Sequence, residues 1–230
     1  PMMESHKNAM SHPPSPTAYS DSGPRPILRH SRIKRMGWSL GIALVMSIPV
    51  AAPAADIVPV KFTTPNGMTV VVLEQHFLPI VELHALIKAG SSQDPPEKAG
   101  VANLVASLLD EGTTSRSSKQ LAEQIDFVGG SLGAQAGEDF TTASTRILRK
   151  DLDLGFTLLA DILQRPAFPK QEFERVRSQI LGEIASDNDD PSHVAMKAFN
   201  QLVYQNHPYR WPIHGTEETL SKITLSDIQS

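Results

Sequence analysis

The 230-residue chain lacks cysteine altogether and has little tryptophan or tyrosine, with two and three residues respectively. Without cysteine it can form neither a disulfide framework nor a thiolate metal site, so any metal ion would need histidine or carboxylate ligands. The chain also lacks a stripe of basic side chains interleaved with aromatic ones. That absence argues against nucleic acid as a partner.

Charge is distributed unevenly along the chain. Residues 1–54 hold six Lys or Arg and two Asp or Glu, which leaves 15 basic and 23 acidic side chains, a net charge of −8, for residues 55–230. Residues 1–35 are rich in Pro, Ser, His and Arg and show no apolar periodicity. We therefore expect them to be disordered or to be upstream sequence from an early start.

Residues 36–54 have the pattern of a secretory signal peptide. A basic cluster that ends at Arg35 precedes an apolar run over 36–50, and Ala52-Pro53-Ala54 fits the A-x-A cleavage pattern. We expect cleavage beside Ala54 and a periplasmic or otherwise exported protein with no membrane contact afterwards. The alternative is an uncleaved anchor, since the apolar stretch approaches the roughly 20 residues that span a bilayer.

Residues 55–230 predict an α+β fold, a two-layer domain with a largely antiparallel sheet packed on helices. Pro65-Asn66-Gly67 lies between two strand-like segments and predicts a hairpin, and Gly137-Glu138-Asp139 lies at the centre of a second one. The segment from Pro79 alternates apolar and polar residues, which predicts a further strand. Strands that come in hairpins, with helices that come in runs, favour this fold class.

Helix boundaries are marked by capping residues and prolines. A Ser117-x-x-Gln120 capping box begins one amphipathic segment, and helices are also expected after Pro169 and Pro191. A last helix would begin near Thr224, close to where the sequence stops. We therefore expect the domain over residues 55–230 to be truncated at its C-terminal end.

The stretch AGVANLVASLLDEGTT, residues 99–114, predicts a helix with two different faces. Its large apolar side chains fall on one arc at about 100° per residue, and Gly112 follows them as a C-terminal stop. The opposite arc carries Asn103, Ala106 and Ser107, where a solvated helix would usually carry long charged side chains. Small side chains on this face leave room for another group to approach.

Four segments follow one another in a specific order: TTPNGMTVVVLE, KAGSSQDPPEKAGVANLVASLLDEGTT, SLGAQAGEDFTTASTRI, and a block from FERVRSQILGEI to NHPYRWPIHGTEETL. Their succession closely resembles the N-terminal domain of the insulinase-type (M16) zinc peptidases, the family of pitrilysin, insulin-degrading enzyme and the mitochondrial processing peptidase. The resemblance runs from about Val60 to Ser230. Its strongest marks are the frame of Gly100, Ala102, Gly112 and Thr113 and the downstream HPY and GTEE blocks.

That family carries an inverted H-x-x-E-H zinc motif on the helix inside this frame. The resemblance places the first His at Asn103, the Glu at Ala106, the second His at Ser107 and the third zinc ligand at Glu183. Zinc hydrolysis needs two imidazoles at i and i+4 and a carboxylate base. The resemblance therefore implies no catalytic residue, no metal site and no bound zinc, and we expect Glu183 to hydrogen-bond Asn103 or Ser107 instead.

The other histidines do not form a replacement motif in the sequence. None of His76, His84, His193, His207 and His214 belongs to an i, i+4 pair. We therefore expect no relocated metal site. His207 lies at a position that recurs in the family's loop, and we interpret it as a structural hydrogen-bonding residue.

The resemblance implies a pseudoenzyme: a non-catalytic, substrate-binding subunit of a periplasmic two-chain M16 zinc peptidase. Its expected partners are a zinc-bearing M16 chain, with which it would form a heterodimer, and a peptide or unfolded polypeptide substrate that the partner cleaves. One alternative is a binding or assembly protein without a protease partner. Another is an active zinc metalloendopeptidase, which would require a different alignment over 103–107.

Overall fold

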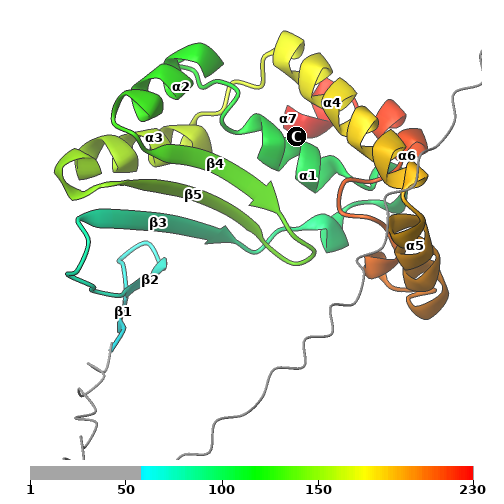
Figure 1. Cartoon of the computed structure of the whole chain (residues 1–230), viewed down its shortest axis with the longest axis horizontal. Coiled ribbons are helices and arrows are strands. Elements are labelled where there is room, and N and C mark those ends of the chain that lie inside the picture. Colours follow the sequence, from blue (N-terminus) through cyan, green and yellow to red (C-terminus); the bar gives the residue numbers. More distant parts are fainter. Residues whose placement is uncertain (1–57, 230) are drawn as a thin grey trace, which may run out of the picture. The chain divides into compact units, whose positions relative to one another are not determined.

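The computed structural model of this chain describes residues 58–229 (Figure 1). The signal peptide predicted over 36–54, its cleavage beside Ala54 and the segment before it lie outside the described residues, so these boundaries stay predictions. Within residues 58–229, no helix combines the length and the apolar character needed to cross a membrane.

The first described element is the hairpin that the sequence predicts. Strands β1 (Val60–Thr63) and β2 (Thr69–Val72) pair antiparallel, with Val60 opposite Val72. Gly67 lies in the turn with a φ of 86°, a left-handed conformation that favours glycine. The hairpin forms a two-stranded sheet of its own.

A second, three-stranded sheet forms the main β layer. Strands β3 (Ile80–Ile87), β4 (Ser131–Ala136) and β5 (Thr141–Leu148) are arranged in the order β3-β5-β4, and both pairings are antiparallel. The β4–β5 hairpin turns at the predicted place. On β5 the side chains alternate, so that Ala143, Thr145 and Ile147 are buried while Arg146 is exposed.

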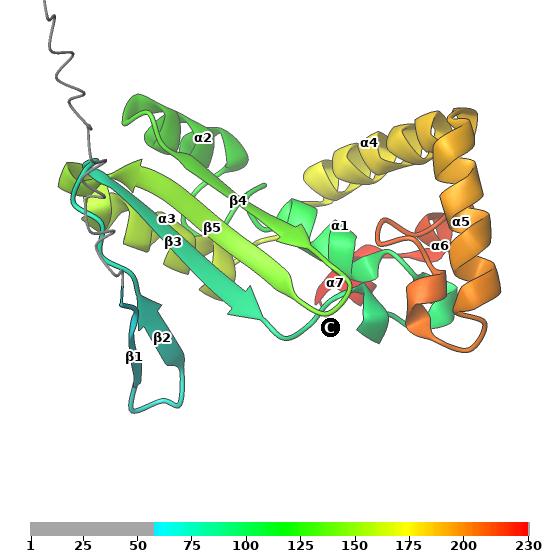
Figure 2. The ribbon, with the colours of Figure 1, turned by 60° about the horizontal axis from the view of Figure 1, so that its bottom comes forward.

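Helices cover the buried face of this sheet. Helix α2 (Ser118–Phe127) begins with the predicted capping box, and α3 (Leu152–Gln164) packs Leu158 and Ile162 in one apolar cluster with Ala143 and Ile147 of β5. No helix lies over the other face of the sheet in the described part of the chain (Figure 2). The two-layer α+β prediction is confirmed.

A second apolar cluster lies among helices. It joins α1 (Val101–Leu108) to α4 (Lys170–Asp189), α6 (Glu217–Lys222) and α7 (Leu225–Gln229). Helix α4 contributes Phe173, Val176, Ile180 and Ile184, whose spacing of three or four residues places them on one face. Helix α5 (Pro191–Val203) follows directly, and the short 3-10 helix η4 (Pro208–Arg210) leads back toward α6.

Candidate functional site

Helix α1 carries the residues at the predicted zinc-motif positions, and an acid from the preceding loop holds its N-terminus. The Asp94 carboxylate accepts hydrogen bonds from the backbone N–H of Gly100 at 2.8 Å and of Ala102 at 3.1 Å. Burial raises the pKa of Asp94, although these backbone hydrogen bonds act in the opposite direction. Gly100, at the N-cap, has a φ of 103°, and no side chain at that position caps the helix. The capping role of Asp94, six residues away, was not found from the sequence.

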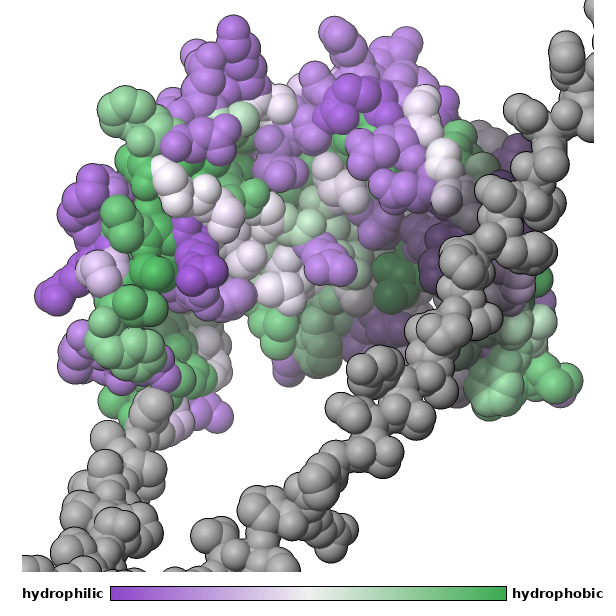
Figure 3. Space-filling model, viewed as in Figure 1, coloured by the Kyte–Doolittle hydropathy of each residue, from purple (hydrophilic) through white to green (hydrophobic). Residues whose placement is uncertain are grey.

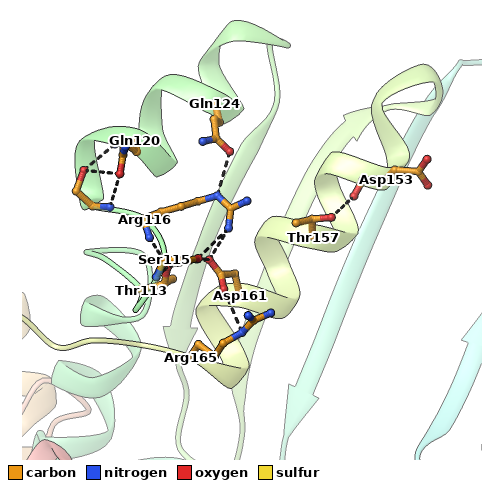
Figure 4. Close-up of polar contacts among 10 residues, drawn as sticks. Thr113, Ser115, Arg116, Gln120, Gln124, Asp153, Thr157, Asp161 and Arg165 are labelled. Atoms are coloured by element: carbon orange, nitrogen blue, oxygen red, sulfur yellow. Dashed lines mark hydrogen bonds and ion pairs between the residues drawn. The ribbon is translucent and has the colours of Figure 1, made fainter.

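A buried acid on α3 fixes the loop that follows α1 (Figure 4). The side chain of Asp161 is 1% exposed, and its Oδ2 accepts hydrogen bonds from Thr113 Oγ1, Ser115 Oγ and Arg116 Nη1, each at 2.7 Å. Burial alone would raise the pKa of Asp161. The hydrogen bonds outweigh burial and hold its pKa below the ordinary value.

A second ionic contact connects the end of α1 to α4. Arg175 of α4 forms an ion pair with Glu111 and a second one with Glu172, and Glu111 also accepts a hydrogen bond from Ser118 Oγ at 2.9 Å. Hydrogen bonds to Glu111 and Glu172 raise the pKa of Arg175, so it stays charged. Helix α1 is therefore held at both ends, with its orientation relative to α4 defined.

The small-residue face of α1 is more enclosed than the sequence pattern indicates. Ala106 has no exposed surface, while Asn103 and Ser107 are half-buried. Helix α1 packs beside β4, and a methyl group added to Gly133 of β4 would lie 3.7 Å from Asp110 Oδ2. Asp110, two residues after the end of α1, is therefore the residue of this segment that approaches Gly133. The small side chain of Ala106 is thus covered by neighbouring parts of the chain, while Asn103 and Ser107 keep some exposed surface.

The contact predicted for Glu183 is also wrong. Glu183 is exposed on α4, and its Oε1 accepts a hydrogen bond from Gln179 Nε2 at 3.1 Å, within the same helix. In the described residues, neither Asn103 nor Ser107 has a side-chain hydrogen bond to it. The reason is local: Gln179 lies one helical turn before Glu183, and an i, i+4 pair is the nearest available partner on a helix surface.

These side chains do not fit a zinc ion. An amide at Asn103 and a hydroxyl at Ser107 are weak neutral donors, Ala106 offers no proton acceptor, and a single carboxylate at Glu183 cannot complete a tetrahedral site. Residues 58–229 contain no group of three or more His, Asp or Glu side chains placed to hold a metal ion. That these four residues occupy former zinc-motif positions stays a prediction.

The histidines take other roles. His207 Nδ1 accepts a hydrogen bond from the backbone N–H of Tyr209 at 3.3 Å, which agrees with the structural role expected of it. His193 Nδ1 lies 2.7 Å from Asp187 Oδ1, and His214 Nε2 lies 3.4 Å from Asp187 Oδ2. The sequence did not predict that Asp187, His193 and His214 lie together, because their contact depends on how α4, α5 and the loop before α6 pack.

Comparison with known proteins identifies the family. The model of the insulinase family, peptidase family M16, matches residues 69–217, and this chain belongs to that family. An uncharacterized zinc protease of Rickettsia felis is 33% identical over 159 residues, which are 69% of this chain and 39% of that protein. Another, from Mycobacterium bovis, is 31% identical over 183 residues, 78% of this chain and 41% of that protein. The chain therefore spans about two fifths of these relatives' length.

Solved structures share the fold. The peptidase M16 inactive domain from Pseudomonas fluorescens matches with a TM-score of 0.70 and 27% identity, over 74% of this chain and 42% of that chain. A protease from Helicobacter pylori matches with a TM-score of 0.70 and 24% identity, over 75% of this chain and 42% of that chain. The predicted membership of the M16 family and the predicted fold class are both confirmed.

Proposed function

We propose that this chain is the non-catalytic, substrate-binding subunit of a periplasmic two-chain M16 peptidase, in which a zinc-bearing partner chain performs the cleavage. The observation that carries the proposal is the side-chain chemistry of α1. Asn103, Ala106 and Ser107 supply neither two imidazoles nor a carboxylate base, and Ala106 is fully buried. This face of α1 cannot activate a water molecule for hydrolysis.

Family membership supports a polypeptide as the ligand. The relatives from Rickettsia felis and Mycobacterium bovis are described as zinc proteases, and the solved relative from Pseudomonas fluorescens as an inactive domain. A domain of this family without the hydrolytic side chains can still present a binding surface, because binding and bond cleavage use different groups. We therefore assign substrate binding to this domain, which keeps the family's fold without its hydrolytic side chains.

The sheet offers a surface for this role. Figure 2 shows the face of the sheet that no helix covers. By the pairing of β3 with β5 and the alternation of side chains, Glu82, His84, Ser144 and Arg146 lie on that face, and Arg146 Nε lies 3.2 Å from Glu82 Oε1. These polar and charged side chains are exposed or half-buried. An extended polypeptide has hydrogen-bonding groups along its whole main chain, so a polar sheet face is suited to contact it.

Export and pairing are the remaining parts of the proposal. The signal-peptide pattern over 36–54 favours the periplasm. Without its own catalytic groups, the chain needs a partner that has them, and a stable interface between two such domains would bury at least about 1,000 Å². A zinc-bearing M16 chain is the partner whose chemistry completes the function.

Co-purification combined with a cleavage assay tests the proposal. The chain and a zinc-bearing M16 chain from the same organism should elute together from a sizing column, and the mixture should cleave an unfolded peptide that neither cuts efficiently alone. A mixture in which the partner's motif glutamate is replaced by glutamine should form the complex without cleavage. If the partner is fully active alone and no complex forms even with peptide present, the chain is a binding or assembly protein without a protease partner.

A further inference from the structure

Helix α5 has no buried residue. Its large apolar side chains are exposed, with Phe199 57%, Leu202 69% and Val203 52% accessible, while the polar residues Lys197 and Asn200 are half-buried. Figure 3 has the same view as Figure 1 and shows an apolar surface over α5. An amphipathic helix normally buries its apolar side. Helix α5 therefore leaves its apolar side uncovered by the rest of the described chain.

A groove of about 270 Å³ lies between α4, α5 and the segment from η4 to His214. Its apolar walls are formed by Ile184 of α4, by Val194 and Met196 of α5, and by Pro212 of the loop before α6. Ligand sites for drug-sized molecules have roughly 300 to 1,000 Å³. The groove is therefore of a size for one terminal residue of a longer ligand rather than for a large cofactor.

Two cations line the groove without an acidic partner among the described residues. Lys197 is half-buried and forms no ion pair with any of them. Arg210 donates from Nη1 to the Gln205 carbonyl at 2.8 Å, and its guanidinium carbon lies 5.4 Å from the centroid of the Trp211 ring. Its Nε is buried without a hydrogen-bond partner. Arg210 therefore has a buried donor that no group of the described chain satisfies, and charge-assisted hydrogen bonds from a guanidinium to a carboxylate are strong.

Asp187, the acid that lines the groove, is already engaged. It has His193 Nδ1 at 2.7 Å from one carboxylate oxygen and His214 Nε2 at 3.4 Å from the other. Among the described residues, its carboxylate forms no ion pair with Lys197 or Arg210. Partly buried charges without a partner are costly, and a bound anion would offset that cost.

We infer that the groove between α4, α5 and η4 binds the C-terminal residue of a polypeptide, with the carboxylate on Lys197 and Arg210 and an apolar side chain against Ile184, Met196 and Pro212. The combination of two unpaired cations with apolar walls matches a carboxylate attached to an apolar group. The inference rests on the proposed function, in which the ligand is a peptide.

Fluorescence anisotropy with the purified full chain tests this inference. The probes are two labelled peptides of about ten residues that end in phenylalanine and differ only at the C-terminus, one a free acid and the other an amide. The acid should bind about tenfold or more tightly than the amide, because hydrogen bonds to charged groups are the strong ones. Lys197→Gln and Arg210→Gln should each remove most of that difference. The matched control Lys170→Gln, on the exposed first turn of α4, should keep it.

The outcomes separate this inference from the proposed function. Equal binding of acid and amide overturns the carboxylate site but leaves peptide binding intact. Failure of both peptides to bind contradicts the substrate-binding role and the groove together. If decanoate displaces the acid peptide at a lower concentration than the unlabelled peptide does, the ligand is a fatty acid and the peptide assignment is wrong. Thermal melting followed by circular dichroism shows whether Arg210→Gln is folded. If it is unfolded, the test rests on Lys197→Gln and on the comparison of the acid peptide with the amide peptide.

Discussion

Glu183 accepts a hydrogen bond from Gln179, one turn earlier on α4, at 3.1 Å. The side chain at the position predicted for the third zinc ligand is therefore engaged within its own helix rather than with α1. Asn103 and Ser107, on α1, are half-buried and offer only an amide and a hydroxyl. The polar cluster that would connect the two helices is absent from the described residues.

We predict that the purified chain binds no stoichiometric zinc, and that Asn103→His with Ser107→His creates a measurable zinc affinity. Two imidazoles at i and i+4 supply the ligands that the helix lacks. Elemental analysis after dialysis and calorimetric titration measure both quantities. About one zinc ion per chain in the unmodified protein would contradict the prediction.

The same pair of substitutions combined with Glu183→Gln is the control for the third ligand. If the side chain of Glu183 can turn from Gln179 toward α1, the control should bind zinc more weakly than the double variant.

Adding Ala106→Glu to the double variant should lower the melting temperature, because Ala106 has no exposed surface and overpacking costs about 1 to 3 kcal/mol.

Asp161→Asn should destabilise the chain by about 2 to 3 kcal/mol at pH 7, since it removes the charge that accepts three hydrogen bonds at Oδ2. The pKa of Asp161 is lowered by folding, so its stabilisation is complete above the ordinary aspartate pKa of about 3.9 and is lost as the pH falls through the lower folded value. The difference from the unmodified chain should therefore shrink below about pH 4.

Urea unfolding at pH 7 and at about pH 3.5 measures this difference. Asp153→Asn is the matched control, because Asp153 is an exposed acid on the same helix (Figure 4) and should change stability little at either pH. A deficit in Asp161→Asn that is the same at both pH values would show that packing, rather than the carboxylate charge, is responsible.

We predict export with cleavage beside Ala54. The exported form should begin at Ala55 or within a residue or two of it, because the A-x-A pattern ends at Ala54. Mass spectrometry of the periplasmic fraction measures the N-terminus. A mature protein that retains Trp38 would show instead that the apolar run is an uncleaved anchor.

The sequence by itself determined the elements and the family. Hairpin turns at Gly67 and Gly137, the Ser117 capping box and the prolines at the starts of α4 and α5 are local signals, and the structure has a turn or a helix start at each. Local backbone preferences depend on residues a few positions apart, so a single sequence contains them. The frame around α1 likewise indicates the M16 family, because its glycines and small residues lie at fixed spacings within one short segment.

Only the tertiary structure decided which side chains meet. Asp161 lies 48 residues after Thr113, and the partners of Asp187 come from α5 and the loop before α6. Ala106 is buried, and α5 leaves its large apolar side chains exposed, although an amphipathic helix normally buries them. These contacts depend on how whole elements pack, because a helical pattern defines a face but not the neighbour that this face will touch.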